Sequence, residues 1–389
     1  MPIVNRVADL HGEITAWRRD IHAHPELLYD VHRTSATVAA QLAAFGCDDV
    51  VSGIGRTGVV GVIRGNRPGG TRKVIGLRAD MDALPIQEAN DISYKSTLPG
   101  KMHACGHDGH TAMLLGAAKY LAETRNFAGT AVMIFQPAEE GGAGGLAMMR
   151  DGLMERFAIE EVYGMHNFPG LPAGAFSIRS GPIMAATDNI TVEIEGVGGH
   201  AARPHIAIDP ILVGAQMVNQ LQSIVSRNVD PVEAAVVSIC TFQAGGADNI
   251  IPQTALLRGT ARSLKPEVRE LLRRRIAEVV EGVARLHGAR ANFTLRRGYP
   301  VLSNHERETA FAASVAAEIA GTDGVDTDMA PVMGGEDFSY MLEARPGAFI
   351  FVGNGDSAGL HHPGYNFNDD VIPFGTSYWV RLIETAMAG

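Results

Sequence analysis

The sequence predicts an α/β protein, in which a mostly parallel β-sheet covered by helices is interrupted by a small inserted α+β domain. Three observations support this prediction. The chain has 389 residues, more than the ~100–200 residues that are usual for one domain. Strand and helix patterns alternate in the first half and again at the end of the chain. The middle instead shows the apolar–polar alternation of strands that bury only one face.

The first half of the chain contains the first alternation. Residues 73–79 (KVIGLRA) form a short apolar run typical of a buried strand, and residues 111–124 predict a helix. The pattern continues with strand 130–136, a helix near 144–154, and strands 160–166 and 174–179. Alternating strands and helices indicate parallel pairing with helices on both faces of the sheet.

The middle of the chain predicts a separate domain over residues 185–298. Its expected elements are strand 188–195, helix 207–228, strands 234–243 and 254–262, helix 266–288 and strand 290–296. That order is the split βαβ or ferredoxin-like arrangement. Alternation then resumes with helix 306–320, strand 348–352 and a helix near 374–387. We therefore expect residues 1–184 and 299–389 to form one domain around the insertion.

The composition is that of an ordinary globular protein, 46% hydrophobic and 20% charged. A net charge of −10 and a pI near 5.8 argue against nucleic acid or anionic membrane as a partner, and favour a small molecule. No apolar run approaches the ~20 residues of a membrane span. The first residues lack a signal-type apolar stretch, so we expect a cytoplasmic protein. The three cysteines, Cys47, Cys105 and Cys240, are too scattered for a disulfide framework.

Residues 103–110 read HACGHDGH and concentrate three histidines, a cysteine and an aspartate, although the whole chain has only 14 histidines. Imidazole, thiolate and carboxylate groups hold zinc and similar divalent ions. The segment lies where a strand passes to a helix, a usual place for sites in α/β folds. We interpret it as metal-binding. The alternatives are a cluster of helix-capping and core residues, or Cys105 acting as a nucleophile.

Two adjacent carboxylates, Glu139 and Glu140, follow strand 130–136 in the sequence QPAEEGG. Adjacent side chains diverge, so one can bind a metal while the other faces the substrate as a proton carrier. Taken alone, such a pair would be interpreted as a solvated loop. His166 in GMHN and His361 in LHHPGY would singly be packed or surface residues. Together with HACGHDGH, these residues supply the donors that one or two ions need.

Other polar residues are candidates for supporting roles. In GLRADMDALPI, Asp82 is the stronger candidate for orienting a ligating histidine and Asp80 the second, the alternative being a turn whose acids face solvent. The inserted region carries His200 in GVGGHAARPH, followed later by Asn249 and Arg262. An arginine with an amide would suit a substrate carboxylate, because the guanidinium group offers a fixed fork of donors.

Taken in order, HACGHDGH, QPAEEGG, GMHN, GGHAARPH, GGEDFS and LHHPGY resemble the amidohydrolase branch of the zinc-dependent exopeptidases, the aminoacylase/carboxypeptidase family. That branch contains hippurate hydrolases, bacterial aminoacylases and plant auxin-conjugate hydrolases. The resemblance runs from about His24 to Asp369. It implies a zinc-exopeptidase-like catalytic domain built from both ends of the chain, with an inserted lid that also forms a dimer interface. The metal ligands that it implies are Cys105, His107, Glu140, His166 and His361.

The resemblance also implies a reaction. It predicts two divalent ions per chain, Glu139 as the general base and His200 as an oxyanion donor, and it fits Asn249 and Arg262 as binders of the substrate carboxylate. In the wider superfamily a histidine binds metal where this sequence has Asp80. The metal is therefore left open among zinc, manganese, nickel and cobalt.

The resemblance thus predicts a homodimer, or a dimer-based oligomer, that hydrolyses the amide bond of N-acyl amino acids such as hippurate. One alternative is a metallo-dipeptidase or carboxypeptidase that uses the same metals on small peptides. The other is a metal-binding protein without turnover, in which Glu139 would have no purpose.

Overall fold

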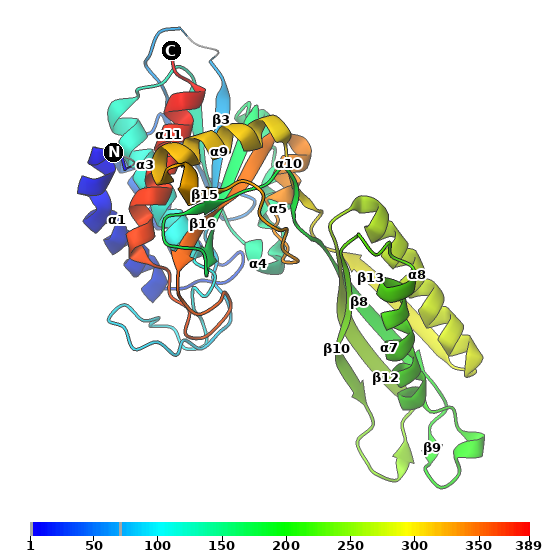
Figure 1. Cartoon of the computed structure of the whole chain (residues 1–389). Coiled ribbons are helices and arrows are strands. Elements are labelled where there is room, and N and C mark those ends of the chain that lie inside the picture. The colour runs from blue at the N-terminus through cyan, green and yellow to red at the C-terminus, as the bar shows by residue number, and fades with distance from the viewer. Residues whose placement is uncertain (1–2, 70–71) are drawn as a thin grey trace. The chain divides into compact units, whose positions relative to one another are not determined.

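The computed structural model describes residues 3–69 and 72–389 and divides the chain into two compact units (Figure 1). The first unit consists of Met1–Gly181, Ser303–Ala330 and Asp337–Gly389. The second consists of Pro182–Leu302 and Pro331–Glu336. The second unit contains the whole predicted insertion, residues 185–298. It also contains residues 182–184, 299–302 and 331–336, which the sequence interpretation left in the first domain.

An eight-stranded sheet forms the centre of the first unit, with the strand order β1-β2-β4-β3-β5-β16-β6-β15. Its strands are β1 Asp49–Ile54, β2 Gly58–Arg64, β3 Val74–Asp80, β4 Thr130–Gln136, β5 Glu161–Pro169, β6 Phe176–Ser177, β15 Val325–Asp326 and β16 Gly347–Gly355. Strands β4, β3, β5 and β16 pair in parallel, whereas β1 and β2 join antiparallel at one side and β6 joins β16 antiparallel at the other. The predicted mostly parallel sheet is confirmed.

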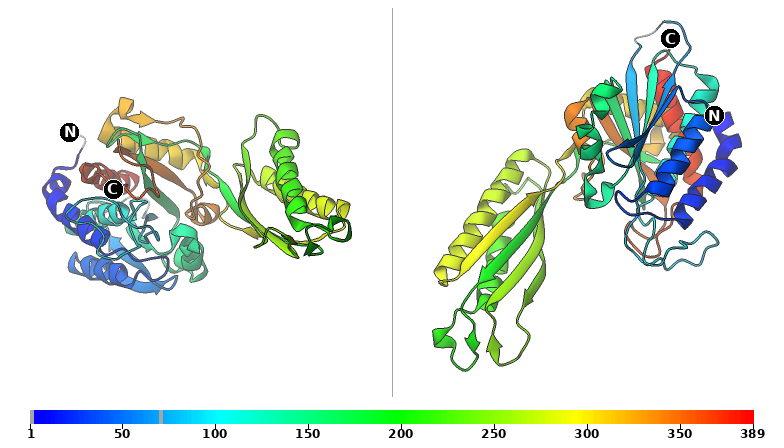
Figure 2. Two further views of the ribbon diagram at one scale, coloured as in Figure 1. Left: turned by 90° about the horizontal axis from the view of Figure 1, so that it is seen from below. Right: turned by 180° about the vertical axis from the view of Figure 1, so that it is seen from behind.

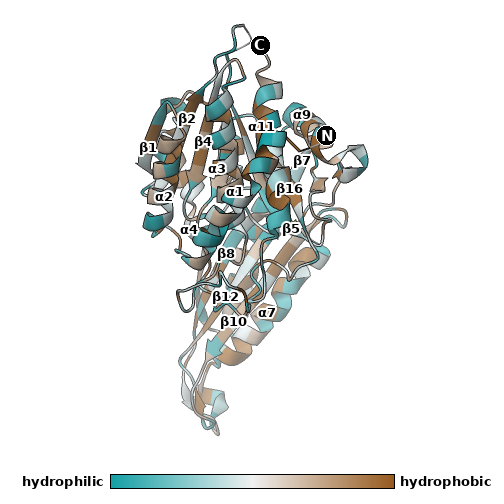
Figure 3. Cartoon of the chain, turned by 90° about the vertical axis from the view of Figure 1, so that its left-hand side faces the viewer, coloured by the Kyte–Doolittle hydropathy of each residue, from teal (hydrophilic) through white to brown (hydrophobic). Residues whose placement is uncertain are grey.

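The central strands are buried on both faces, which explains their apolar sequences. In β3 and β4, every residue after the first is buried. Strands that are covered on both sides read as continuous apolar runs. Figure 3 shows hydrophobic colours along β2 and β4.

Helices cover this sheet. They are α1 Asn5–Ala23, α2 His32–Ala44, α3 His107–Thr124, α4 Glu139–Gly142, α5 Gly144–Arg150, α6 Leu153–Arg156, α9 Glu306–Ala320, α10 Ser339–Ala344 and α11 Ile372–Ala386. Leu114 of α3 and Trp379 of α11 share one buried core with Leu77 of β3. Burial of such side chains contributes about 1.5–3 kcal/mol each to folding, and it anchors α3, which carries part of the site, against the sheet.

The second unit is a four-stranded antiparallel sheet in the order β10-β12-β8-β13, the order of a ferredoxin-like fold. Its elements are β8 Ala186–Glu195, α7 Pro210–Arg227, β10 Ala235–Ala244, β12 Thr254–Ser263, α8 Pro266–Leu286 and β13 Arg290–Arg297. Burial alternates along β8, so this sheet has one covered face, and Figure 2 shows α7 and α8 on one side of it. The remaining short strands pair as β7 Gly181–Met184 with β14 Leu302–Asn304, and as β9 Gly199–His200 with β11 Ile250–Ile251.

Glycines explain two differences from the predicted elements. Helix α3 begins at His107 rather than at residue 111, because Gly106 adopts a φ of 89° and turns the chain into the helix. The helix predicted near 144–154 is divided into α5 and α6 at Gly152, which has a φ of 81°. A third difference lies in the strand predicted at 174–179, which is reduced to the two residues of β6.

Candidate metal centre

Parallel strands bring the candidate residues of the first unit to one edge of the sheet, because their carboxyl ends meet there. Asp80 is the last residue of β3, and Glu139 and Glu140 follow the end of β4. His166 lies in the second half of β5, and His361 lies in the loop after β16. Chain segments far apart in sequence thus converge on one place.

Cys105, His107 and His166 form the buried part of the cluster. The Sγ atom of Cys105 is 3.4 Å from Nε2 of His166. One ligand atom from each of the three residues lies within 4.8 Å of the other two. A thiol and two imidazoles at this spacing are donors that suit zinc and similar ions.

Glu140 and His361 extend the cluster. The Oε1 atom of Glu140 is 3.3 Å from Nε2 of His361 and 4.0 Å from Nε2 of His107. Cys105, Glu140 and His361 also place one ligand atom each within 4.8 Å of one another. Cys105 belongs to both triplets, so the five ligands expected from the sequence lie in a single cluster.

His107 has a nitrogen that suits a cation. Its Nδ1 atom hydrogen-bonds to the backbone carbonyl of Asp82 at 2.8 Å. Its Nε2 atom is buried and has no hydrogen-bond partner within the described part of the chain. An unpaired buried polar atom costs free energy. A divalent ion bound at Nε2 would remove that cost.

Burial and neighbouring charges act on these donors in opposite directions. Burial and the nearby Glu140 and Glu139 carboxylates raise the pKa of the Cys105 thiol, and burial lowers the pKa of His166. Burial also disfavours charged His107, but the carboxylates of Asp80 and Asp82 outweigh it and raise the pKa of His107 to about 10. The surrounding carboxylates therefore favour a cation at this place, whether a proton or a metal ion.

Asp82 holds the turn that carries the two glutamates. Its carboxylate accepts hydrogen bonds from the backbone N–H of Glu139 at 2.9 Å and of Glu140 at 3.1 Å. Ala138, just before them, has a φ of 54°, a left-handed conformation that is unfavourable for alanine. Asp82 therefore contacts the ligand histidine through its backbone carbonyl and also through a carboxylate oxygen, 3.5 Å from Nδ1 of His107. The same side chain stabilises the strained turn.

Asp80, the second acid of that motif, lies beside the cluster with both oxygens already bonded. Its Oδ2 atom accepts from Arg78 at 2.7 Å, and its Oδ1 atom is 2.6 Å from Nδ1 of His110. Burial disfavours its charge, but His107 and Arg78 outweigh burial and hold the pKa of Asp80 well below its usual value. His110 was not singled out from the sequence. Its position three residues after His107, on the same side of α3, is the signal that would have indicated it.

The second unit brings His200 and Asn249 together. His200 lies in β9, opposite Ile250 of β11. The backbone carbonyl of Asn249 accepts a hydrogen bond from the N–H of Ala201 at 3.0 Å. Both residues therefore lie near the end of the sheet where β12 begins.

Arg262 lies at the opposite end of the same sheet. It is the penultimate residue of β12 and pairs with Thr187, near the start of β8. Eight steps of extended strand separate it from Thr254, which corresponds to about 26 Å at ~3.3 Å per residue. The sequence suggested Arg262 and Asn249 as a pair. Within a single chain, the second unit therefore keeps these two residues apart.

Comparison with known proteins identifies the family to which this cluster belongs. The model of peptidase family M20/M25/M40 matches residues 76–385, a range that includes all five clustered ligands and Glu139. The chain belongs to this family. As an M20-family hydrolase it is a metal-dependent amidohydrolase, which argues against the alternative of a metal-binding protein without turnover.

Relatives of this M20-family chain match it over nearly its full length. A hippurate hydrolase of Campylobacter jejuni is 42% identical over 382 residues, which cover 98% of each chain. Thermostable carboxypeptidase 2 of Saccharolobus solfataricus is 39% identical, with 96% of each chain covered. The crystal structure of a Bacillus subtilis protein described as a dinuclear metal-binding peptidase of family M20 is similar, with a TM-score of 0.83 and 33% identity. The match covers 98% of this chain and 99% of that one.

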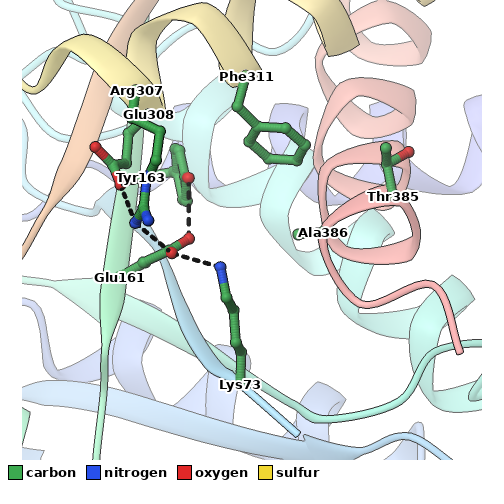
Figure 4. A pocket seen from close by; sticks show the side chains of 8 residues that line it. All are labelled: Lys73, Glu161, Tyr163, Arg307, Glu308, Phe311, Thr385 and Ala386. Atoms are coloured by element: carbon green, nitrogen blue, oxygen red, sulfur yellow. Dashed lines mark hydrogen bonds and ion pairs between the residues drawn. The ribbon is translucent and has the colours of Figure 1, made fainter. Parts of the chain in front are cut away.

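A cavity of this M20-family chain, with a volume of about 290 Å³, lies away from the ligand cluster (Figure 4). Glu161, its central residue, begins β5, whereas His166 lies further along that strand. Glu161 accepts hydrogen bonds from Lys73 at 2.7 Å, Arg307 at 3.1 Å and Tyr163 at 3.2 Å. These groups satisfy one another, so the cavity is lined by a structural ion-pair cluster.

The described helices of this M20-family chain include none that is long and apolar enough to cross a lipid bilayer. The cytoplasmic location expected from the sequence stays a prediction.

Proposed function

We propose that this chain hydrolyses the amide bond of N-acyl amino acids, with Glu139 as general base. The observation that carries the proposal is the position of Glu139. A carboxylate oxygen of Glu139 lies within 4.8 Å of ligand atoms of His107 and Glu140. Its backbone is held by Asp82 at 2.9 Å. A carboxylate fixed beside a ligand cluster, and buried with it, is suited to carrying a proton.

Two divalent ions would be held by Cys105, His107, Glu140, His166 and His361. The donor set supports this part of the proposal, because Cys105 belongs to two triplets and its sulfur lies within 4.8 Å of the ligand atoms of each. Bound ions would lower the pKa of a water molecule and polarise the substrate carbonyl. Thiolate and imidazole donors favour transition metals over calcium and magnesium. Zinc, manganese, nickel and cobalt are therefore the candidates.

In the proposed reaction Glu139 moves one proton twice. It accepts the proton from water as the water oxygen adds to the acyl carbon. It then delivers that proton to the nitrogen of the leaving amino acid as the C–N bond breaks. Glu139 is buried and its backbone is held by Asp82, so its carboxylate stays beside the proposed ligands.

The second unit supplies the remaining groups of the proposal. His200 of the partner subunit would donate a hydrogen bond to the oxyanion. Asn249 of the partner subunit, which neighbours that histidine, and Arg262 of this chain would bind the substrate carboxylate. Exposed apolar side chains support a dimer. Among the described residues, all large exposed hydrophobic side chains except Leu28 and Leu98 belong to the second unit. Exposed apolar groups gathered on one unit are typical of an interface.

A carboxypeptidase or dipeptidase is the second candidate function. It is favoured by the similarity to the thermostable carboxypeptidase described above. The two functions use the same metals and the same base, and differ in whether the group before the scissile amide is an acyl group or an amino acid with a free amine.

A comparison of matched substrates tests the proposal. Benzoylglycine and phenylalanylglycine both carry an aromatic group before glycine, but only the dipeptide has a free amine. We expect the metal-loaded chain to prefer benzoylglycine in kcat/KM. Preference for phenylalanylglycine would establish the peptidase instead. Cleavage of either substrate that survives complete removal of metal would refute the proposed mechanism.

A further inference from the structure

Asn167, the residue after His166 on β5, bonds to two of the proposed ligand residues at once. It is fully buried. Its side-chain amide Nδ2 donates to the backbone carbonyl of Cys105 at 2.6 Å. Its own backbone carbonyl accepts from Nδ1 of His166 at 2.7 Å. The first bond holds the loop that carries Cys105, and the second turns the Nε2 atom of His166 toward the Cys105 sulfur, 3.4 Å away.

Tyr365 and His110 fix Asn167 itself. The hydroxyl of Tyr365 donates to Oδ1 of Asn167 at 2.7 Å. The Nε2 atom of His110 accepts from the backbone N–H of Asn167 at 2.9 Å. A ring nitrogen that accepts an N–H bears no proton, so His110 carries its proton on Nδ1 and donates it to Asp80 at 2.6 Å. The amide Nδ2 of Asn167 thus has two partners, the Cys105 carbonyl and Nε2 of His110 at 3.1 Å, and its Oδ1 has the Tyr365 hydroxyl.

Gly106 provides the space for this arrangement. A Cβ atom at residue 106 would lie 2.3 Å from Nδ2 of Asn167 and 2.5 Å from the Tyr365 hydroxyl. Its φ of 89° is also unfavourable for any other residue. The glycine between Cys105 and His107 therefore lets the asparagine–tyrosine pair approach the ligand-bearing loop.

We propose that Asn167, held by Tyr365 and His110, is a positioning residue that sets the geometry of Cys105 and His166 for metal binding. The inference rests on the proposed metal site. Partners that orient metal ligands in this way commonly change metal affinity by about 10–100-fold when they are removed. A residue with a purely structural role would alter stability without altering the thiolate–metal bond.

Cobalt titration of the full-length, metal-depleted chain tests the inference. Co²⁺ bound to a thiolate gives a charge-transfer absorption band, so the band reports on Cys105 directly. The variants are Asn167→Ala and Tyr365→Phe. The matched control is Asn304→Ala, which removes another buried asparagine of the first unit that bonds to the backbone carbonyls of Arg179 and Phe349, at 3.0 and 2.8 Å.

We expect Asn167→Ala to weaken cobalt affinity by about 10–100-fold and to diminish the thiolate band. Tyr365→Phe should cause a smaller loss, and Asn304→Ala should leave both quantities unchanged. If Tyr365→Phe folds with wild-type thermal stability, it tests the inference even where Asn167→Ala does not fold. The inference would be overturned if both variants folded and matched the Asn304→Ala control in cobalt affinity and in band intensity. The proposed metal site would stand in that case. Absence of the band in the wild-type chain would refute Cys105 as a ligand, and the inference with it.

Discussion

The carboxylate of Asp82 accepts the backbone N–H of Glu139 at 2.9 Å, and its second oxygen accepts that of Glu140 at 3.1 Å. The side chain of a third residue therefore holds the path of the chain at the glutamate pair. A change in either glutamate side chain leaves both of these hydrogen bonds in place, which makes the two proposed roles separable by experiment.

Glu139→Gln should keep the metals and lose turnover, because the change removes a proton carrier and none of the proposed ligands. We expect kcat for benzoylglycine to fall at least ~100-fold, with two ions per chain retained by elemental analysis. Glu140→Gln is the matched control, and it should lose metal as well as activity. Near-normal kcat in metal-loaded Glu139→Gln would remove Glu139 from the mechanism.

Cys105→Ser should weaken metal retention, because an alcohol is a much poorer donor than a thiolate. Activity should return in part when the metal concentration is raised. Dialysis followed by metal analysis, and kcat measured against added Zn²⁺ or Mn²⁺, check both expectations. A variant that held both ions normally would exclude Cys105 as a ligand, whereas a nucleophilic role would leave added metal without effect.

His200 should act on the site of the partner subunit, and two inactive variants can reveal this. When His200→Ala and Glu139→Gln chains are mixed and reassociated, about half of the dimers should be mixed. In each mixed dimer, one site receives an intact Glu139 from one chain and an intact His200 from the other. About a quarter of all sites should therefore recover activity.

Two controls accompany the mixing experiment. Gel filtration of differently tagged chains must show that the subunits have exchanged. With exchange established, the absence of recovered activity would mean that His200 serves its own chain.

Asp108 should make stability depend on pH in the acid range. Burial opposes its ionisation, but Arg18, 2.8 Å away, and His22, 2.7 Å away, hold the pKa of Asp108 well below its usual value. A lowered pKa stabilises the fold fully above the usual value, and this contribution is lost as pH falls below it. Asp108→Asn should thus destabilise the chain near neutral pH by at most roughly 3–5 kcal/mol, because it removes the nearer of the two carboxylates that pair with buried Arg18 and leaves only Asp369, 3.4 Å away.

Urea denaturation of the wild-type chain and of Asp108→Asn, from about pH 5 to about pH 3, checks the direction in which stability changes with pH. The difference in unfolding free energy between wild type and Asp108→Asn should shrink as pH falls. Asp49→Asn, which removes the exposed partner of Arg64, is the control and should change stability by less than ~1 kcal/mol at every pH. If the difference in unfolding free energy between wild type and Asp108→Asn stayed constant or grew as pH fell, the lowered pKa of Asp108 would be contradicted.

The central sheet could be predicted because each of its buried strands forms an apolar run of its own. The N-terminal elements could not. Helix α1 buries Arg18 and His22, so charged residues occupy positions where an apolar stripe is expected and the helical pattern is obscured. The antiparallel attachment of β1 and β2 depends on pairing between distant segments, which local patterning does not reveal.

The ligand set could be proposed from sequence because its residue types are chemically unusual and stand in short motifs. The groups that orient them are ordinary residues joined across long distances. Tyr365 and Asn167 are 198 positions apart, and Arg78 and Asp337, which form an ion pair, are 259 apart. Only folding brings such partners together, so no spacing in the sequence marks them.

In the second unit, His200 lies in β9 near one end of the four-stranded sheet and Arg262 lies at the other end of that sheet. This placement has a consequence for how activity depends on protein concentration. An N-acyl amino acid is much shorter than the ~26 Å of strand between the two ends. If both residues contact the same substrate molecule, two different chains must provide them. An isolated subunit would then hold its metals and its base but lack part of its binding site. Specific activity should fall on dilution below the dissociation constant of the dimer, while the metal content of each chain stays the same.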